Sequence, residues 1–273
     1  MPTKIVGILN ITPDSFSDGG RFIEITPALE QLRLMLFAGA DIIDIGAEST
    51  RPSFTPVQPE EEWRRLEKIF PAIVETIKKF NHDQNKKIEI SLDTRHAKVA
   101  KHAHEIGIDI LNDVGGLIDN EMIEFIVRNN LKTILMHSLP VPVNPEIVVN
   151  QALNVTGEIL KWAREKILFL ERKSVKKSQL IFDPGIGFGK NVLQSLRILK
   201  NIDAFRALEL PIYVGHSKKS CLDALEISGL KNNKESRAEK TLVISNYLAQ
   251  KGVEFLRVHD VAGNKNVVEA LSL

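Results

Sequence analysis

Short β-rich runs alternate with longer stretches of helical spacing eight times along the 273 residues, which predicts an α/β fold, a (β/α)8 TIM barrel. Eight repeats favour a closed barrel over a doubly wound open sheet. A chain of this length is typical of one barrel domain, and no linker-like segment divides it. We therefore expect a single domain over residues 1–273. The expected strands are Lys4–Asn10, Asp41–Ile45, Lys87–Leu92, Asp109–Asn112, Lys132–His137, Gln179–Asp183, Leu210–Gly215 and Val253–His259.

Proline and glycine positions indicate where the helices begin and end. Pro27 and Pro59 stand near expected helix starts, where the missing N–H of proline has no intrahelical partner to lose. Gly39 and Gly107 end helical stretches before the next strand. The longest helical stretch is expected over about Pro145–Lys173, long enough to pack on the barrel or against a second subunit.

The composition excludes several classes of partner. A formal net charge of +1, without a long Lys/Arg block, gives no electrostatic footprint for nucleic acid or a membrane surface. No run approaches the ~18 apolar residues of a membrane span, and the first residues lack the pattern of a signal peptide. The one cysteine, Cys221, excludes an intramolecular disulfide and agrees with a reducing compartment. We therefore expect small-molecule ligands and a cytoplasmic location.

Polar residues stand at the carboxyl ends of the expected strands, the face where the active sites of barrels lie. A strand can end in a polar residue merely because the chain reaches solvent. That explanation accounts for any one position, but hardly for all eight together with two long connections, 12–21 and 48–58. We therefore expect one pocket with acidic and basic sectors. The strand-end residues are Asn10, Asp44, Glu48, Asp93, Asn112, Met136, His137, Asp183, Lys218, Lys219, Arg257 and His259.

The last strand carries the basic sector. Its alternation places Arg257 and His259 on one side, and Lys219 follows the neighbouring strand, so the three can hold a diphosphate. The opposite sector carries carboxylates and an amide that can accept hydrogen bonds from a heterocycle. These are Asp93, Asn112 and Asp183. The pocket is therefore predicted to bind a ring with a phosphorylated tail.

A glycine-rich turn, Asp183-Pro-Gly-Ile-Gly-Phe-Gly-Lys190, follows the sixth strand. It is not a dinucleotide fingerprint, because the third glycine of G-x-G-x-x-G would fall at Lys190. It is not a phosphate loop either, because Asn191 stands where Ser or Thr is needed. The turn alone is compatible with an ordinary strand-to-helix connection or with a corner that wraps a ligand.

Motifs in order along the whole chain resemble those of dihydropteroate synthases. They are Asn10-Ile-Thr-Pro-Asp-Ser-Phe-Ser-Asp-Gly-Gly20, Asp44-Ile-Gly-Ala-Glu-Ser-Thr-Arg-Pro52, Ser91-Leu-Asp-Thr94, Asn112-Asp-Val114, Asp183-Pro-Gly-Ile-Gly-Phe-Gly-Lys190, Lys219-Ser220 and Arg257-Val-His-Asp260. The resemblance implies condensation of a dihydropterin methyl diphosphate with p-aminobenzoate, giving dihydropteroate and diphosphate in folate synthesis. It also implies Mg²⁺ as cofactor and a homodimer.

The resemblance also implies roles for individual residues. Residues matching the pterin-binding positions are Asp93, Asn112, Met136, Asp183, Phe188 and Lys219. Those matching the diphosphate positions are Asn10, Arg257 and His259, and Asn10 also matches the metal position. Those matching the p-aminobenzoate positions are Thr50, Arg51, Pro52 and Ser220. The residues expected to be catalytic are Asp183, Lys219, Arg257 and His259.

Two alternative functions stay open. A pterin-binding methyltransferase domain has a similar barrel and pocket but needs no diphosphate site, so Arg257 and His259 argue against it. A non-catalytic pterin-binding homologue is favoured only by departures from the family pattern. Ala47 and Ser53 replace usual glycines, and Lys218 replaces a usual arginine, which exchanges a planar fork for a point charge.

Other features are expected to be structural. Three histidines lie on one helix, but at ~100° per residue two of them face different directions, so a shared metal is not expected. They are His96, His102 and His104. Cys221 is expected to pack as a small apolar residue, and Lys231–Lys240 to be a solvated charged segment. Asp14 and Asp18 are either turn formers or contacts to the incoming amine.

Overall fold

The computed structural model describes residues 2–12, 25–48, 56–139, 144, 146–150 and 152–270. Within them, eight parallel strands form one sheet in the order β6-β5-β4-β3-β2-β1-β8-β7. An isolated parallel bridge between Phe182 and Ile212 joins the two ends of this sheet, so the barrel is closed. The strands are β1 (Lys4–Asn10), β2 (Ile42–Gly46), β3 (Glu89–Asp93), β4 (Ile110–Asp113), β5 (Lys132–Met136), β6 (Leu180–Asp183), β7 (Tyr213–Val214) and β8 (Phe255–Val258).

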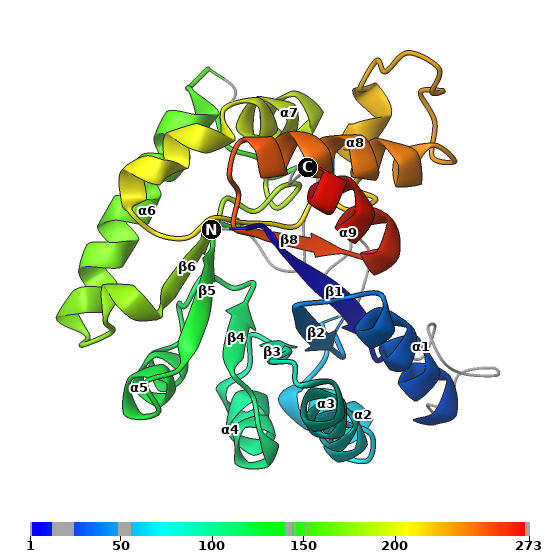
Figure 1. Ribbon diagram of the computed structural model, residues 1–273. Coiled ribbons are helices and arrows are strands. Elements are labelled where there is room, and N and C mark those ends of the chain that lie inside the picture. The colour runs from blue at the N-terminus through cyan, green and yellow to red at the C-terminus, as the bar shows by residue number, and fades with distance from the viewer. Residues whose placement is uncertain are drawn as a thin grey trace.

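Helices surround the ring of strands on its outside (Figure 1). They are α1 (Ile25–Phe37), α2 (Pro59–Leu66), α3 (Phe70–Gln84), α4 (Ala97–Ile106), α5 (Asn120–Arg128), α6 (Val155–Arg172), α7 (Val192–Lys200), α8 (Arg237–Gln250) and α9 (Val261–Glu269). Short 3₁₀ helices are η1 (Lys177–Gln179), η2 (Ile202–Leu208) and η3 (Ser220–Ala224). No described helix has the length and apolar character that a membrane crossing requires. The predicted single (β/α)8 barrel is confirmed.

Two expected elements are shorter in the structure. β7 covers only two residues of the expected strand Leu210–Gly215, because Pro211 has no N–H to donate to a strand ladder. Its carbonyl instead accepts a hydrogen bond from the Phe182 N–H at 2.8 Å. Helix α6 begins at Val155, and the described residues before it, 146–150 and 152–154, are not helical. Pro145 itself lies outside the described residues.

The segment before α6 is held across the glycine-rich turn. The Val149 N–H donates to the Gly189 carbonyl at 3.0 Å, and the Val149 carbonyl accepts from the Gln194 side chain at 2.6 Å. Asn154 then caps α6 by accepting from the Gly157 N–H at 3.4 Å. The described residue Val149 therefore bonds to the glycine-rich turn and to α7 and is not part of a helix.

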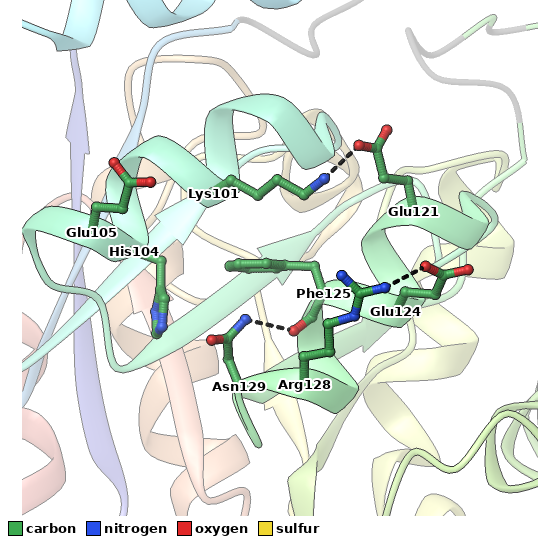
Figure 2. A pocket seen from close by; sticks show the side chains of 8 residues that line it. All are labelled: Lys101, His104, Glu105, Glu121, Glu124, Phe125, Arg128 and Asn129. Atoms are coloured by element: carbon green, nitrogen blue, oxygen red, sulfur yellow. Dashed lines mark hydrogen bonds and ion pairs between the residues drawn. The ribbon is translucent and has the colours of Figure 1, made fainter.

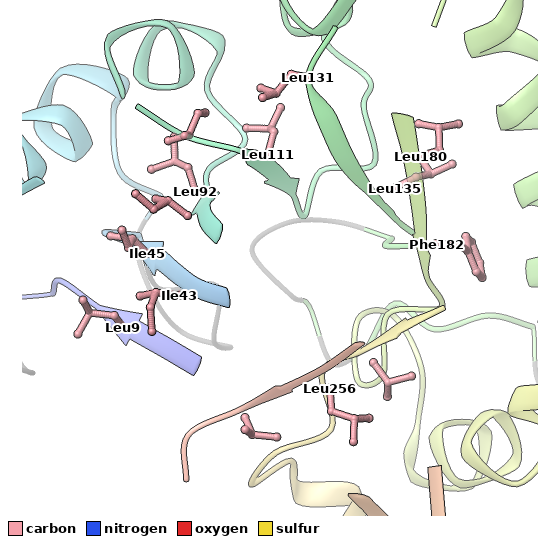
Figure 3. Packing of buried hydrophobic residues seen from close by; sticks show 14 of the residues in the cluster. Leu9, Ile43, Ile45, Leu92, Leu111, Leu131, Leu135, Leu180, Phe182 and Leu256 are labelled. Atoms are coloured by element: carbon pink, nitrogen blue, oxygen red, sulfur yellow. The ribbon is translucent and has the colours of Figure 1, made fainter. Parts of the chain in front are cut away.

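Apolar residues form two separate layers. In the outer layer, side chains such as Leu92, Leu111 and Leu256 point away from the ring of strands toward the helices (Figure 3). The inner cluster fills the barrel itself with one side chain from each of six strands. Its members are Val6, Ile42, Ile110, Ile134, Ile181 and Tyr213. The interior is therefore a packed core, and any ligand site must lie above it at the strand ends.

Candidate active site at the carboxyl ends of the strands

The inner face of the barrel changes from apolar to polar toward the carboxyl ends of the strands. Side chains on a strand alternate with a period of two, so the residue two positions after an inner-cluster member faces the same way. Three of these six positions are polar and buried: Asp44 on β2, Asn112 on β4 and Asp183 on β6. The other three are Ile8, Met136 and Gly215. The inner cluster therefore forms the floor of a polar site.

Arg257 on β8 lies inside this polar layer between two carboxylates. Its Nε is 2.6 Å from Asp44 Oδ2, and its Nη2 is 2.6 Å from Asp93 Oδ2. Asp44 is also held by the Ser91 hydroxyl at 2.5 Å and by the Asn112 amide at 3.1 Å. The sequence placed Asp44 at a strand end but assigned it no role; in the structure it is the centre of the network.

The network changes the protonation of its members. Burial raises the pKa of Asp93 to about 7, against the lowering effect of Arg257, and the nearby Asp44 raises it further. Burial opposes the charge of Arg257, but the two carboxylates outweigh it and raise the pKa of the guanidinium above its ordinary value. Arg257 is therefore charged. Its single positive charge is paired with two carboxyl groups, those of Asp44 and Asp93.

Asp183 sits on a corner that only glycine can complete. The Gly185 N–H donates to Asp183 Oδ1 at 2.7 Å, and Gly185 has a φ of +68°. A Cβ at this position would lie 2.0 Å from the His137 carbonyl oxygen. The glycine thus allows the β6 turn to pack directly on the end of β5 and fixes the carboxylate.

Lys219 lies over the glycine-rich turn that follows Asp183. Its Nζ lies 4.3 Å from the centre of the Phe188 ring, a cation–π distance. Phe188 packs with Met136 and Val114 in one small cluster, so the predicted wall of Met136 and Phe188 exists as a contact. The site therefore combines a flat apolar surface with a cation at its edge.

Both charged groups of this sector have shifted titrations. Burial raises the pKa of Asp183 to about 6, partly offset by the Gly185 hydrogen bond and by Lys190. Burial lowers the pKa of Lys219 to about 8, and Arg257 lowers it further, whereas Asp183 opposes that shift. At neutral pH the carboxylate is mostly ionised and the ammonium mostly protonated, so the pair presents both charges to a ligand.

Lys190, at the end of the glycine-rich turn, is a site-neighbouring residue to which the sequence assigned no role. Its buried Nζ lies 2.7 Å from His137 Nδ1 and 2.8 Å from the His137 carbonyl oxygen. Burial lowers the pKa of the His137 ring to about 3, and the Lys190 charge adds to this effect. His137 is therefore neutral and accepts from the lysine, which ties the β6 turn to the end of β5.

Asn10 and His259 lie at the ends of β1 and β8, and both are half-buried. His259 Nδ1 is 3.0 Å from the Ser217 hydroxyl, which belongs to the connection that carries Lys219. Arg257 alternates with the buried Leu256 and Val258 along β8, and the half-buried His259 directly follows the strand. The basic sector thus spans β8 and the β7 connection.

The expected p-aminobenzoate side is only partly within the described residues. Ser220 is described, is exposed, and begins η3 next to Lys219. Six positions named from the sequence lie outside the described residues. They are Asp14, Asp18, Thr50, Arg51, Pro52 and Ser53.

The described chain on either side of residues 49–55 is firmly bonded. Glu48 accepts two hydrogen bonds from Arg95, at 2.8 and 2.9 Å, and one from the Val57 N–H at 2.9 Å. The nearby Glu62, whose pKa is influenced by the charges of Glu48 and Arg95, has a fully buried side chain. Its Oε1 has no hydrogen-bond partner. Burial raises the pKa of Glu62 to about 8, despite the bond from Thr94. Sequence alone did not single out Glu62.

Features set aside from the sequence have structural partners. His102 stacks on Trp63 with ring centroids 5.0 Å apart, and His104 meets the edge of Phe125 at 5.4 Å. Cys221 is buried, which raises the pKa of its thiol to about 11. The expectation of a solvated segment Lys231–Lys240 is wrong for Lys240, whose side chain is fully buried.

A pocket of ≈ 340 Å³ lies between α4 and α5, away from the strand ends, and contains none of the predicted site residues (Figure 2). Its cations are already paired: Lys101 with Glu121, and Arg128 with Glu124 at 3.3 Å. The chemistry predicted from the sequence therefore belongs to the strand ends and not to this pocket.

Comparisons with known proteins agree with this geometry. The family model for pterin binding enzymes matches residues 6–259. A dihydropteroate synthase of Streptococcus pyogenes serotype M6 is 38% identical over 269 residues, which are 98% of this chain and 94% of that protein. A probable bifunctional folylpolyglutamate synthase/dihydropteroate synthase of Haloferax volcanii is 39% identical over 96% of this chain, but the match spans only 29% of that protein's length.

Solved structures give the same answer. Dihydropteroate synthase from Anaplasma phagocytophilum, with bound 6-hydroxymethylpterin-monophosphate, superposes with a TM-score of 0.86 and 36% identity, covering 100% of this chain and 99% of that one. The Xanthomonas albilineans enzyme with 4-aminobenzoic acid has a TM-score of 0.84 and 29% identity, covering 99% and 92%. The chain therefore belongs to the pterin binding enzyme family, with dihydropteroate synthases as its relatives.

Proposed function

We infer that this protein is a dihydropteroate synthase, a transferase of folate biosynthesis. It would join 7,8-dihydropterin-6-ylmethyl diphosphate to p-aminobenzoate and release diphosphate. The observation that carries this conclusion is that the buried Asp183 carboxylate and the Lys219 ammonium, which lies 4.3 Å from the centre of the Phe188 ring, are close enough to shift each other's pKa, with Arg257 also acting on both. Relatives of this chain hold 6-hydroxymethylpterin-monophosphate, 4-aminobenzoic acid and 7,8-dihydropteroate.

The acidic sector suits a pterin ring. The carboxylate of Asp183 can accept hydrogen bonds from the amino and ring N–H groups, and Asn112 can donate to and accept from the ring. Phe188 and Met136 supply a flat apolar contact for its face. The negative charge of Asp183 also stabilises positive charge that develops on the pterin methylene, so this residue need not act as a strong base.

The basic sector suits the leaving group. In the reaction the bond between the methylene carbon and the diphosphate oxygen breaks, and its electron pair leaves with the diphosphate. The amine nitrogen of p-aminobenzoate forms the new bond to carbon and loses a proton. Arg257, His259 and Lys219 can stabilise the charge that accumulates on the diphosphate. Arg257 would do this through guanidinium N–H groups other than the Nε and Nη2 donors that Asp44 and Asp93 already accept from.

We propose Mg²⁺ as a partner of the diphosphate. Among the described residues, no group of three or more His, Cys, Asp or Glu side chains can hold a metal ion, and Asp44 is already bound to Arg257. Mg²⁺ commonly binds through few protein ligands together with substrate phosphates and water. We propose that the side-chain oxygen of Asn10 is the protein ligand. The ion would supply charge neutralisation for the leaving group.

We also propose a homodimer in the cytoplasm. Leu168 on α6, Leu193 on α7 and Val243 on α8 are exposed apolar side chains on three neighbouring helices. A second copy of the chain would cover them. Equilibrium sedimentation tests this proposal, because Leu193→Asp should shift a dimer to monomer while Asp203→Ala, at an exposed position of η2, should not.

A coupled assay for diphosphate release tests the proposed reaction. The full-length protein should release diphosphate only when the pterin diphosphate, p-aminobenzoate and Mg²⁺ are all present. No release under those conditions would reject the synthase. Pterin binding retained without turnover would instead favour the non-catalytic homologue, and methyl transfer without a requirement for diphosphate would favour the methyltransferase.

A further inference from the structure

Lys240, in the first turn of α8, has a fully buried side chain. Its ammonium meets three oxygens: the Leu225 carbonyl at 2.7 Å, the Asn232 side chain at 2.9 Å and the Asp223 carbonyl at 3.3 Å. An ammonium has three N–H donors, so each donor has one acceptor. A buried lysine needs such a set of partners, because an ammonium without hydrogen bonds is costly to bury.

All three acceptors belong to the β7–α8 connection, residues 215–236. Two are backbone carbonyls at the end of η3, where a helix leaves carbonyl groups without intrahelical partners. Their bonds to Lys240 therefore satisfy groups that would otherwise be orphaned in the interior. The third acceptor, Asn232, lies farther along, so one side chain gathers both halves of the connection onto α8.

Neighbouring residues of α8 hold the same connection. Arg237 pairs with the Asp223 carboxylate, with Nε 2.6 Å from Oδ1. The Thr241 hydroxyl accepts from the Lys218 N–H at 3.1 Å. The amino-terminal part of α8 therefore contacts the connection at both sides of η3.

The connection carries residues of the candidate site. Lys219 precedes η3 and Ser220 begins it. The Lys219 carbonyl accepts from the Leu222 N–H at 3.1 Å, and the Leu225 N–H donates to the Leu222 carbonyl at 3.1 Å. Because these bonds link Leu225 to Lys219 through Leu222, a displacement of Asp223 and Leu225 would also displace Lys219. The Lys219 Nζ would then move from its position over the Phe188 ring.

We propose that Lys240 is a positioning residue for substrate binding: its ammonium fixes η3 and thereby holds Lys219 and Ser220 in place for the pterin and the p-aminobenzoate. The substrates named here rest on the proposed function. Without the ammonium, only a fraction of the molecules would have the connection ordered before the substrate binds. The apparent affinity for substrate would be reduced in proportion to that fraction.

This role predicts a particular kinetic pattern in Lys240→Met, which keeps an unbranched side chain only one atom shorter and removes the ammonium. KM for both substrates should rise about fivefold or more, while kcat stays within about twofold, because ordering affects bound ground state and transition state alike. Lys251→Met, at a partly exposed lysine at the other end of α8, is the matched control and should leave both parameters unchanged. Unchanged KM in Lys240→Met would overturn the proposal, even if its melting temperature fell.

Hydrogen exchange tests the same proposal without any substrate. The Leu222 and Leu225 amides of Lys240→Met should exchange about tenfold faster or more than in wild type, while β4 amides should not change. Equal exchange in the two proteins would contradict the proposal. If Lys240→Met does not fold, Asn232→Ala removes one acceptor from an exposed position and should accelerate the same amides about threefold. An inactive wild type would reject the synthase but leave this measurement fully informative.

Discussion

Asp44 on β2 and Arg257 on β8 are joined by a part-buried ion pair, Oδ2 to Nε at 2.6 Å, and β1 is the strand between them in the sheet. The same guanidinium reaches Asp93 on β3 at 2.6 Å. Three ionisable side chains on three strands are therefore held together at the barrel mouth before any ligand arrives. Arg257 is consequently aimed by Asp44, whereas the sequence predicted only its contact with diphosphate.

Asp44→Asn should destabilise the protein by about 3 kcal/mol, because removing one partner leaves a largely buried guanidinium with a single carboxylate. Urea unfolding at neutral pH measures this loss. Asp203→Asn is the control, since Asp203 is exposed and lies 3.5 Å from Lys251. That exposed pair should contribute about 0–1 kcal/mol. Equal effects of the two substitutions would show that the Asp44–Arg257 pair does not hold the mouth together.

Glu62→Gln should change how stability depends on pH. The folded protein holds the Glu62 proton up to about pH 8, whereas the unfolded chain loses it near the ordinary value of 4.5. Ionisation therefore favours unfolding, and wild-type stability should fall relative to Glu62→Gln as pH rises from 4.5 through 8, by an amount on the order of 4 kcal/mol. Urea unfolding across this range gives the difference directly.

The matched control for this titration is Glu60→Gln. Glu60 is exposed on the same helix and lies 2.9 Å from Lys98. Its difference from wild type should stay flat between about pH 5 and 9. A flat difference for Glu62→Gln over the same range would mean that its carboxyl is ionised and solvated in the folded protein.

Gly185→Ala should damage both stability and pterin binding. The new methyl group would lie 2.0 Å from the His137 carbonyl oxygen, so the β6 turn and Asp183 must shift. Gly229→Ala provides the comparison: its φ is +82°, but a Cβ there meets nothing within 4 Å. Gly185→Ala should therefore cost about 2–3 kcal/mol more than Gly229→Ala.

Calorimetric titration with a pterin completes that test. Affinity should fall in Gly185→Ala and not in Gly229→Ala, because only the former displaces the N–H that holds Asp183. Equal destabilisation by both substitutions would indicate that positive φ, and not close packing, explains the glycine.

The sequence predicted the barrel and most of its strand-end residues because both have local signals. Each strand is a short apolar run, and Asp93 or Asp183 directly ends one. The local pattern mispredicts element ends where backbone hydrogen bonds depend on another segment. Strand β7 is shorter than predicted because Pro211 has no N–H to donate. Helix α6 begins later than predicted because the Val149 N–H bonds to the glycine-rich turn.

Side-chain roles that depend on distant partners could not be predicted. Asp44 and Arg257 are 213 positions apart, so no local pattern links them. Glu62 is one of three consecutive glutamates in the first turn of α2, and only the fold decides that it is the buried one. Lys240 looked solvated for the same reason, since its three acceptors come together only when η3 packs on α8.

Product formation tests the proposed synthase most directly. The full-length protein is incubated with the pterin diphosphate, Mg²⁺ and isotope-labelled p-aminobenzoate, and both products are quantified by mass spectrometry. We predict labelled dihydropteroate in one-to-one ratio with diphosphate, and a loss of about a hundredfold or more in Asp183→Ala, which lacks the carboxylate that binds the pterin. Diphosphate released without labelled dihydropteroate, or wild-type turnover by Asp183→Ala, would contradict the assignment.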